Sequence, residues 1–199
     1  LYKMFGIDAE LLIDHAWGYE TCRMSDIKNY HSEEHSLSNG QVLMRNYSFD
    51  EALVIVREMT DNLVLDLFEK GLVTNSLTLW IAYDHRYEHE ASKGTVKLER
   101  ESNSSKKIID AVEDLYLRIA DRYTGIRRIE VCANRVAPES YVQYSLFDDP
   151  KQTDKERHLQ EAVLNVKQRY GKNAIMRGSN LLECSTYRER NEQIGGHRA

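Results

Sequence analysis

The sequence contains no apolar run close to the ~20 residues that a membrane span requires, and it has no signal peptide. Cysteine is scarce: Cys22, Cys132 and Cys184 are far apart and odd in number, so they form neither a disulfide framework nor a metal-ligand spacing. A reducing cytoplasm is therefore the simplest compartment, with no membrane partner. The first residue is Leu1 rather than Met, and we expect the chain to begin inside a longer reading frame.

Motifs that carry out chemistry are also missing. The sequence has no glycine-rich phosphate-binding loop and no plausible pair of nucleophile and base. His85 and His89 stand four residues apart beside acidic neighbours, but their segment is typical of a hairpin loop, which disfavours a metal site. The paired carboxylates of Asp148 and Asp149 are better explained as a solvated acidic flank. We expect no catalytic residue, metal or cofactor in this chain.

The charge of the chain excludes a generic nucleic-acid binder, because such proteins are usually basic and the net charge here is −5. Residues 1–34 carry 3 basic and 7 acidic side chains, residues 35–140 carry 14 and 17, and residues 141–199 carry 10 and 8. Any contact with DNA should therefore be local and assisted by a tether, since the charge of the whole molecule does not attract a polyanion.

The middle of the chain predicts alternating strands and helices. Ser48 and Glu51 form a capping box, and the helix that they open should end at Gly71. A second helix should begin after Ser104 or Ser105 and extend its apolar stripe to Tyr123. Strands are expected at residues 41–45, 76–83, 95–101 and 126–136, the first after a turn at residues 38–40.

This order, β-α-β-β-α-β, predicts an α+β fold: a four-stranded antiparallel sheet with two helices on one face, in the split βαβ arrangement. The other face of the sheet should remain open to solvent or to a partner.

Two flanking regions accompany this domain. Residues 7–17 form an amphipathic pattern that ends at Gly18 and predicts an N-terminal helix too short to bury much surface alone. Residues 20–35 are typical of a linker. On the other side, Thr153 and Glu156 resemble a capping box, which predicts a helix that ends at Gly171 and packs on its own domain. The polar tail beyond should be partly mobile.

Three short motifs mark the predicted strands. A serine-rich stretch, Ser36-Leu-Ser-Asn-Gly40, precedes the first strand, Ser92-Lys-Gly-Thr95 leads into the third, and Ile126-Arg-Arg-Ile129 opens the fourth. Small hydroxyl, amide and glycine residues expose backbone N–H groups that can meet phosphate oxygens, although each motif alone also suits an ordinary turn or a solvated edge. Because side chains alternate along a strand, only one of the two adjacent arginines can point to a given face.

Taken together, the element order and the three collinear motifs resemble the little-finger domain of Y-family translesion DNA polymerases, in particular the bacterial UmuC-like members. The resemblance covers residues 5–140. It implies the end of a thumb helix at residues 1–19, a linker at 20–35, a DNA-binding domain at 36–140 and a tail at 141–199. It further implies sequence-independent contacts to the phosphates of primer–template DNA by Ser36, Ser38, Asn39, Gly40, Lys93, Gly94, Thr95, Lys97, Arg127 and Arg128.

The same resemblance implies what lies outside the chain. Polymerases of this family hold Mg²⁺ in a palm domain, which would precede Leu1, so the parent protein is expected to be a polymerase of DNA damage tolerance and the SOS response. One departure is His35, which stands where a basic residue often precedes the first serine and which weakens the expected grip at neutral pH.

A further motif follows the predicted domain. Gln143-Tyr-Ser-Leu146-Phe147 matches the Gln-x-x-Leu-Phe pattern by which bacterial polymerases dock to the sliding clamp. The leucine and phenylalanine of such an extended peptide fill an apolar pocket, and the glutamine supplies a polar anchor. Gln143, Leu146 and Phe147 are therefore the predicted clamp-binding residues.

Two alternatives remain at this stage. A stand-alone ferredoxin-like module that binds a small molecule predicts a pocket lined by Trp80 and indifference to DNA. A protein-interaction adaptor predicts clamp binding that does not require residues 36–140.

Overall fold

The computed structural model describes residues 1–30, 36–86, 89–140 and 149–193. The chain divides into two compact units, residues 1–33 and residues 34–199, and each is described by itself. Within the described residues, no helix is long and apolar enough to cross a membrane.

The first unit consists of three short helices, α1 (Tyr2–Phe5), α2 (Asp8–Ala16) and α3 (Met24–Asn29). Helix α2 confirms the helix predicted before Gly18, which has a positive φ of 73°. Its apolar residues are poorly covered: Leu11 is 58% exposed and Trp17 is 86% exposed. Helix α3 lies inside the stretch predicted as a linker.

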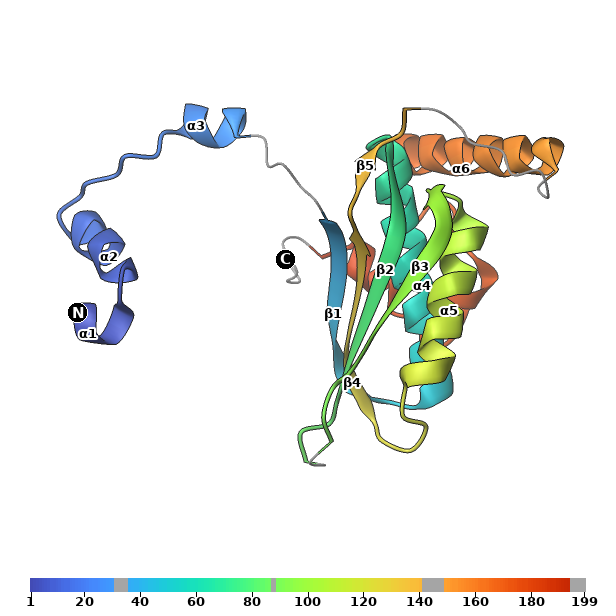
Figure 1. Cartoon of the computed structure of the whole chain (residues 1–199), viewed down its shortest axis with the longest axis horizontal. Coiled ribbons are helices and arrows are strands. Elements are labelled where there is room, and N and C mark those ends of the chain that lie inside the picture. Colours follow the sequence, from blue (N-terminus) through green and yellow to red (C-terminus); the bar gives the residue numbers. More distant parts are fainter. Residues whose placement is uncertain (31–35, 87–88, 141–148, 194–199) are drawn as a thin grey trace. The chain divides into compact units, whose positions relative to one another are not determined.

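The second unit is built on an antiparallel sheet with the strand order β1-β4-β2-β3 (Figure 1). Its strands are β1 (Ser36–Tyr47), β2 (Leu72–Tyr83), β3 (Ser92–Ser102) and β4 (Ile126–Asn134), and the two-residue β5 (Ala137–Pro138) pairs with the start of β2. Strand β4 is antiparallel to both β1 and β2, so these two run parallel with β4 between them. The predicted split βαβ arrangement is confirmed.

The edge strands β1 and β3, like β2, begin earlier than the sequence pattern indicates. Residues 38–40, predicted as a turn, lie inside β1 because Ser36 to Val42 pair in register with Asn134 to Arg128 of β4. Likewise β3 begins at Ser92, which pairs with Ile81 of β2. In both cases the ladder with the neighbouring strand overrides a local preference for turns.

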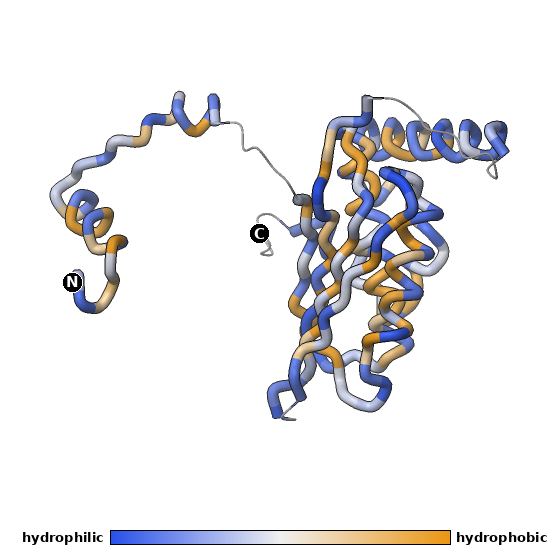
Figure 2. Tube along the Cα trace, viewed as in Figure 1, coloured by the Kyte–Doolittle hydropathy of each residue, from blue (hydrophilic) through white to orange (hydrophobic). Residues whose placement is uncertain are grey.

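Helices α4 (Phe49–Glu69) and α5 (Ser105–Ile119) cover one face of the sheet (Figure 1). The Ser48–Glu51 capping box is confirmed, and Ser104 caps α5 by accepting a hydrogen bond from the Lys107 N–H. Between the layers lies the core, and Figure 2 shows apolar stretches recurring along both helices, whereas the loop after β2 is hydrophilic. The prediction for Tyr123 was wrong: α5 ends at Ile119, and Tyr123 is 95% exposed.

Helix α6 (Pro150–Tyr170) begins one turn before the predicted capping box. Asp149 accepts a hydrogen bond from the Lys151 N–H, and Pro150 at the first helical position needs no partner for its nitrogen. The Glu156 carboxylate instead accepts hydrogen bonds from the Ser104 hydroxyl and the Lys106 N–H at the start of α5. The capping-box prediction was therefore wrong, and the predicted packing of this helix on its own domain is confirmed.

The tail after Gly171 is described through residue 193, and the expectation that parts of it are mobile stays a prediction. It forms a 3₁₀ helix, η1 (Gly178–Leu181), and a short helix, α7 (Tyr187–Asn191). Tyr187 is only 1% exposed and its hydroxyl meets the Lys167 ammonium. The Arg177 guanidinium donates to the Asp61 carboxylate of α4 at 2.6 Å. The tail therefore packs against the helix layer.

Candidate nucleic-acid interface

The side chains of β1 alternate between two environments. Leu43 is fully buried against the helices, and Leu37 also packs on the core. Ser36, Ser38 and Gly40 lie at the alternate positions and are exposed. Alternation along a strand therefore places these three predicted residues on the face of the sheet opposite α4 and α5, which we call the open face.

Strand β3 contributes its predicted residues to the open face in the same way. Lys97, Thr95 and Lys93 stand directly opposite Ser76, Thr78 and Trp80 of β2, and all three are exposed. The hydroxyl groups of Thr78 and Thr95 are 2.9 Å apart and hydrogen-bonded. Cross-strand partners share a face, so this row of lysine and hydroxyl groups runs along the edge opposite β1.

A bulge at the start of β4 separates the two adjacent arginines. Ala82 of β2 pairs with Arg128 and Tyr83 pairs with Ile126, which leaves Arg127 as the extra residue. Arg128 is exposed on the open face, where its guanidinium lies 3.5 Å from the Glu130 carboxylate and 5.0 Å from the centre of the Trp80 ring. Arg128 is therefore available on this face.

Two other predicted residues point to the helices instead. The Asn39 amide donates to the Met59 carbonyl oxygen of α4 at 3.3 Å and accepts from the Arg190 guanidinium of α7. Gly94 pairs with Leu79, and a Cβ atom there would lie 2.8 Å from Leu115 Cδ1. Packing of the helix layer therefore explains Gly94 without any ligand.

Gly40 differs from Gly94 in this respect. A Cβ atom at Gly40 would meet only the Glu130 side chain, at an ordinary 3.7 Å. Glycine inside a strand is unfavourable relative to alanine, by about 0.5–1 kcal/mol, and often marks a place where another backbone or a ligand approaches closely. The protein's own packing therefore does not require a glycine here.

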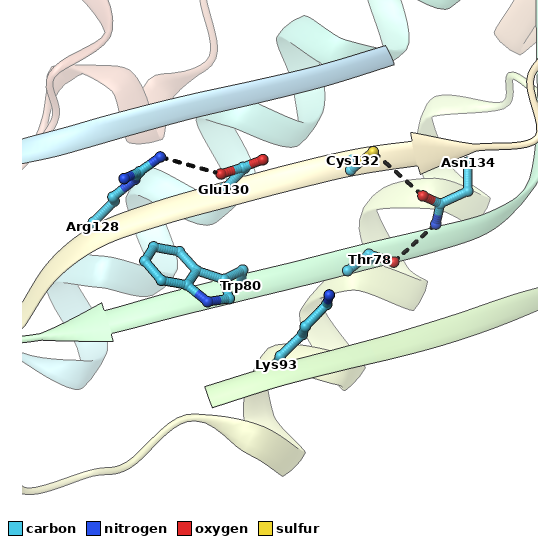
Figure 3. A pocket seen from close by; sticks show the side chains of 7 residues that line it. All are labelled: Thr78, Trp80, Lys93, Arg128, Glu130, Cys132 and Asn134. Atoms are coloured by element: carbon cyan, nitrogen blue, oxygen red, sulfur yellow. Dashed lines mark hydrogen bonds and ion pairs between the residues drawn. The ribbon is translucent and has the colours of Figure 1, made fainter. Parts of the chain in front are cut away.

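The open face also contains a shallow hollow of about 380 Å³ over β2 and β4 (Figure 3). Its lining includes Trp80, Arg128 and Lys93, with Thr78 and Asn134 toward one end. The ligand-binding alternative predicts a pocket lined by Trp80, and this hollow is where such a ligand would lie. The sequence names only Trp80 for this pocket. Its partners in the hollow come from β4 and β3, and the strand register brings them together.

Acidic groups near the hairpin after β2 have structural partners. The Asp84 carboxylate accepts hydrogen bonds from the Arg86 guanidinium and the Asn46 amide, and these bonds hold the pKa of Asp84 well below its usual range. The His89 ring packs at a tilt of 57° against Tyr83, with ring centres 4.3 Å apart. In the part of the chain that the structure describes, no group of three or more His, Cys, Asp or Glu side chains could hold a metal ion.

The predicted clamp-binding residues Gln143, Leu146 and Phe147 lie outside the described residues. The segments on both sides are anchored to the domain. On one side the Glu139 carboxylate accepts two hydrogen bonds from the Arg157 guanidinium of α6, at 2.7 and 2.9 Å, which lower the pKa of Glu139. On the other side Asp149 caps α6.

Comparison with known proteins identifies relatives of this fold. The family described as "impB/mucB/samB family C-terminal domain" matches residues 34–146. "DNA polymerase IV 2" of Bacillus subtilis (strain 168) is 25% identical over 201 residues, covering 99% of this chain and 47% of that protein. "DNA polymerase IV 2" of Halalkalibacterium halodurans is 21% identical over 168 residues, covering 84% of this chain and 40% of that protein. The chain thus spans about half the length of these curated relatives, or less.

Solved structures give weaker matches. The "Complex of beta-clamp processivity factor and little finger domain of PolIV" covers 57% of this chain and 100% of the matched chain, with 11% identity and a TM-score of 0.41. The "Y-family DNA polymerase chimera Dbh-Dpo4(243-245)-Dbh" covers 69% of this chain and 38% of the other, with 16% identity and a TM-score of 0.40.

Proposed function

The chain belongs to the family of C-terminal, little-finger domains of Y-family DNA polymerases, and on this premise we propose that its open face grips primer–template DNA through the phosphates, without catalysis and without reading sequence. The observation that carries the proposal is the shared face of Ser36, Ser38, Gly40, Lys93, Thr95, Lys97 and Arg128. Asn39 and Gly94 point to the helices, and Arg127 is the extra residue of the β4 bulge, so we leave all three out of the proposed contacts.

The spacing of the two edges suits a duplex. Strands β1 and β3 form the edges of the four-stranded order, three strand spacings apart, which amounts to roughly 14 Å. The major groove of B-DNA is about 12 Å wide. Edge strands also present backbone N–H groups without a partner strand, and such groups commonly donate to phosphate oxygens. The two edges can therefore reach the phosphates on either side of one groove.

The electrostatics of the open face favour a weak grip. Lys93, Lys97 and Arg128 are its cations, and Glu130 next to Arg128 offsets part of their charge. If each cation neutralises one phosphate, log K should fall with log salt with a slope of about −3. This modest slope agrees with the net negative charge of the chain, which does not attract DNA over a distance. A domain tethered to a polymerase does not need to bind DNA tightly alone.

Fluorescence anisotropy of a labelled primer–template duplex, titrated with the 199-residue chain over a salt series, tests this proposal. The double variant Lys93→Ala/Lys97→Ala should bind more weakly and shift the salt slope toward zero by about 2. The matched control, Lys106→Ala/Lys155→Ala, removes the same charge from exposed positions on α5 and α6 and should bind like the wild type. Equal loss in both double variants would show that overall charge, not the open face, governs binding.

We further propose that Gln143, Leu146 and Phe147 dock the chain to the bacterial sliding clamp. The motif itself supports this, together with its position between two anchored segments, the Glu139–Arg157 pair and the start of α6. Docking to the clamp would hold the domain close to DNA. The higher effective concentration of DNA would compensate for the weak affinity of the open face.

Surface plasmon resonance with immobilised clamp tests the docking proposal. Leu146→Ala/Phe147→Ala should abolish micromolar-range binding, whereas the control Tyr144→Ala/Ser145→Ala changes only the variable positions of the motif and should retain it. Wild-type protein that fails to bind would refute the docking proposal and leave the DNA proposal intact.

The remaining assignments concern the parent protein. We propose that residues 1–19 end a thumb helix, that residues 20–35 form a linker, and that residues 36–140 and 141–199 are the DNA-binding domain and the docking tail. The parent would be a DNA-directed DNA polymerase of damage tolerance in the cytoplasm, with its Mg²⁺-binding palm outside this chain. The lengths of the curated relatives, about twice that of the chain, support this division.

A further inference from the structure

One feature of the open face has no role in the phosphate grip. Trp80 lies on the central strand β2 and is half-buried, while its sequence neighbours Leu79 and Ile81 are fully buried on the other side of the sheet. Trp80 is therefore not a core residue. Its cross-strand partners are Lys93 on β3 and Glu130 on β4, both hydrophilic, so a large aromatic ring stands among polar groups.

The ring is surrounded by charged and polar side chains, among them two cations and the Glu130 carboxylate. Figure 3 shows the indole between Arg128 and Lys93, with the Arg128 guanidinium carbon 5.0 Å from the ring centre. Farther along the hollow, the Asn134 amide donates to the Thr78 hydroxyl at 2.8 Å, which fixes both groups on the open face. An aromatic ring, two cations, the Glu130 carboxylate that pairs with Arg128, and a pair of oriented polar groups thus line one hollow of about 380 Å³.

This combination matches the chemistry of single-stranded nucleic acid. An aromatic side chain binds a base by stacking on its face, regardless of which base it is, and neighbouring cations hold the adjoining phosphates. In a duplex the faces of the bases stack on each other, and the grooves expose only the base edges. Trp80 can therefore stack only on a base that is unpaired.

We propose that Trp80, supported by Arg128 and Lys93, is a stacking site for an unpaired base of single-stranded DNA. The inference rests on the proposed function, because it takes the open face to be the DNA-binding face, and it adds a second substrate class to it. The hollow lies open on a sheet, unlike the enclosed pockets that bury free nucleotides, so a base carried on a strand suits it better than a free nucleotide.

The fluorescence of Trp80 provides the test. The chain has two tryptophans, and the other, Trp17, is 86% exposed in the first unit, so Trp17→Phe leaves Trp80 as the sole reporter. Titration at low ionic strength with an oligothymidine should quench this fluorescence to saturation, whereas a duplex of equal length, which offers no unpaired base to stack on the indole, should quench it much less. Trp80→Leu should lower the affinity for labelled oligothymidine by about 5- to 100-fold and leave duplex affinity within about twofold.

Two further variants make the result specific. Trp80→Phe keeps a ring and should retain most of the affinity for the oligothymidine, and it shows whether the site tolerates substitution without unfolding. Tyr170→Leu, which removes an exposed aromatic side chain from α6, should change nothing. Thermal melting of each variant checks that the fold is kept.

The outcomes separate the two proposals. The stacking site is supported if Trp80→Leu loses affinity for oligothymidine and keeps its affinity for the duplex. Equal loss of both ligands in a folded Trp80→Leu variant, or no quenching at saturation, overturns it. A different result would refute the proposed phosphate contacts, namely unchanged duplex affinity in the Lys93→Ala/Lys97→Ala variant.

Discussion

Gly94 offers a sharp test of whether packing or ligand contact selects a residue on β3. The family resemblance implies that Gly94 contacts a phosphate. However, a Cβ atom at this position would lie 2.8 Å from Leu115 Cδ1 and 3.1 Å from Ile119 Cγ2. Leu115 is only 2% exposed and has little room to move. Gly94→Ala should therefore overpack the contact between β3 and α5.

The expected size follows from two opposing effects. Overpacking a well-filled core costs about 1–3 kcal/mol. Replacing glycine by alanine in a strand returns about 0.5–1 kcal/mol, because the unfolded chain loses freedom. The net destabilisation should be about 1–2 kcal/mol. With an unfolding slope near 2 kcal/mol/M, the midpoint of urea unfolding should fall by about 0.5–1 M.

Circular dichroism during urea unfolding gives this midpoint, and a second substitution checks the cause. Leu115→Val removes the methyl group that clashes, so Gly94→Ala/Leu115→Val should be more stable than the sum of the single effects predicts, by about 1 kcal/mol. The affinity of Gly94→Ala for duplex DNA should stay within about twofold of wild type. An unchanged midpoint together with a clear loss of DNA affinity would refute the packing explanation.

Four further substitutions test other parts of the structure. Tyr187→Ala should lower the free energy of unfolding by about 3 kcal/mol, because it empties a buried site between the tail and the domain, and limited proteolysis should then cut after Gly171. Glu58→Gln tests a buried carboxylate: burial raises the pKa of Glu58 in the folded protein, so its ionisation destabilises the fold as the pH rises above the unfolded value of 4.5. The variant should therefore gain stability relative to wild type with rising pH, as thermal melting over a pH series would show. Ser48→Ala removes a helix cap and should cost about 1 kcal/mol in the same melting assay, whereas capping at Thr153 is absent, so Thr153→Ala should cost much less.

Local signals in the sequence predict the helices and strands well where a motif acts on its own backbone. The Ser48–Glu51 box specifies the start of α4, and Gly71 and Gly171 end their helices with a positive φ of 62° and 96°. The alternation of Ile129, Val131 and Ala133 predicts the buried face of β4, where all three are 0% exposed. Such features need no knowledge of distant residues.

Features that depend on distant partners could not be predicted in this way. Residues 38–40 favour a turn locally, yet they extend β1 because β4 lies beside them. Tyr187 stands in a polar segment, yet it is buried and its hydroxyl meets Lys167 of the distant helix α6. Thr153 and Glu156 have the right spacing for a cap, but Asp149 and Pro150 start the helix earlier.

For the candidate site, the sequence could not predict the direction in which each side chain points. The ten proposed residues follow from collinear motifs, and seven of them share the open face. Asn39 and Gly94 do not, because alternation from Ser38 and Thr95 turns them toward the helices. The hollow at Trp80 depends on the register of three strands and carries no local signal in the sequence.

The most direct measurement of the central claim is a titration of the isotope-labelled chain with a primer–template duplex, followed by amide chemical shifts in NMR. If the open face binds the duplex, the largest shifts should occur on its two edges and its centre, at residues 36–42 of β1, residues 93–97 of β3 and Arg128 of β4. Shifts concentrated on α4, α5 or the tail, with these strands unperturbed, would contradict it.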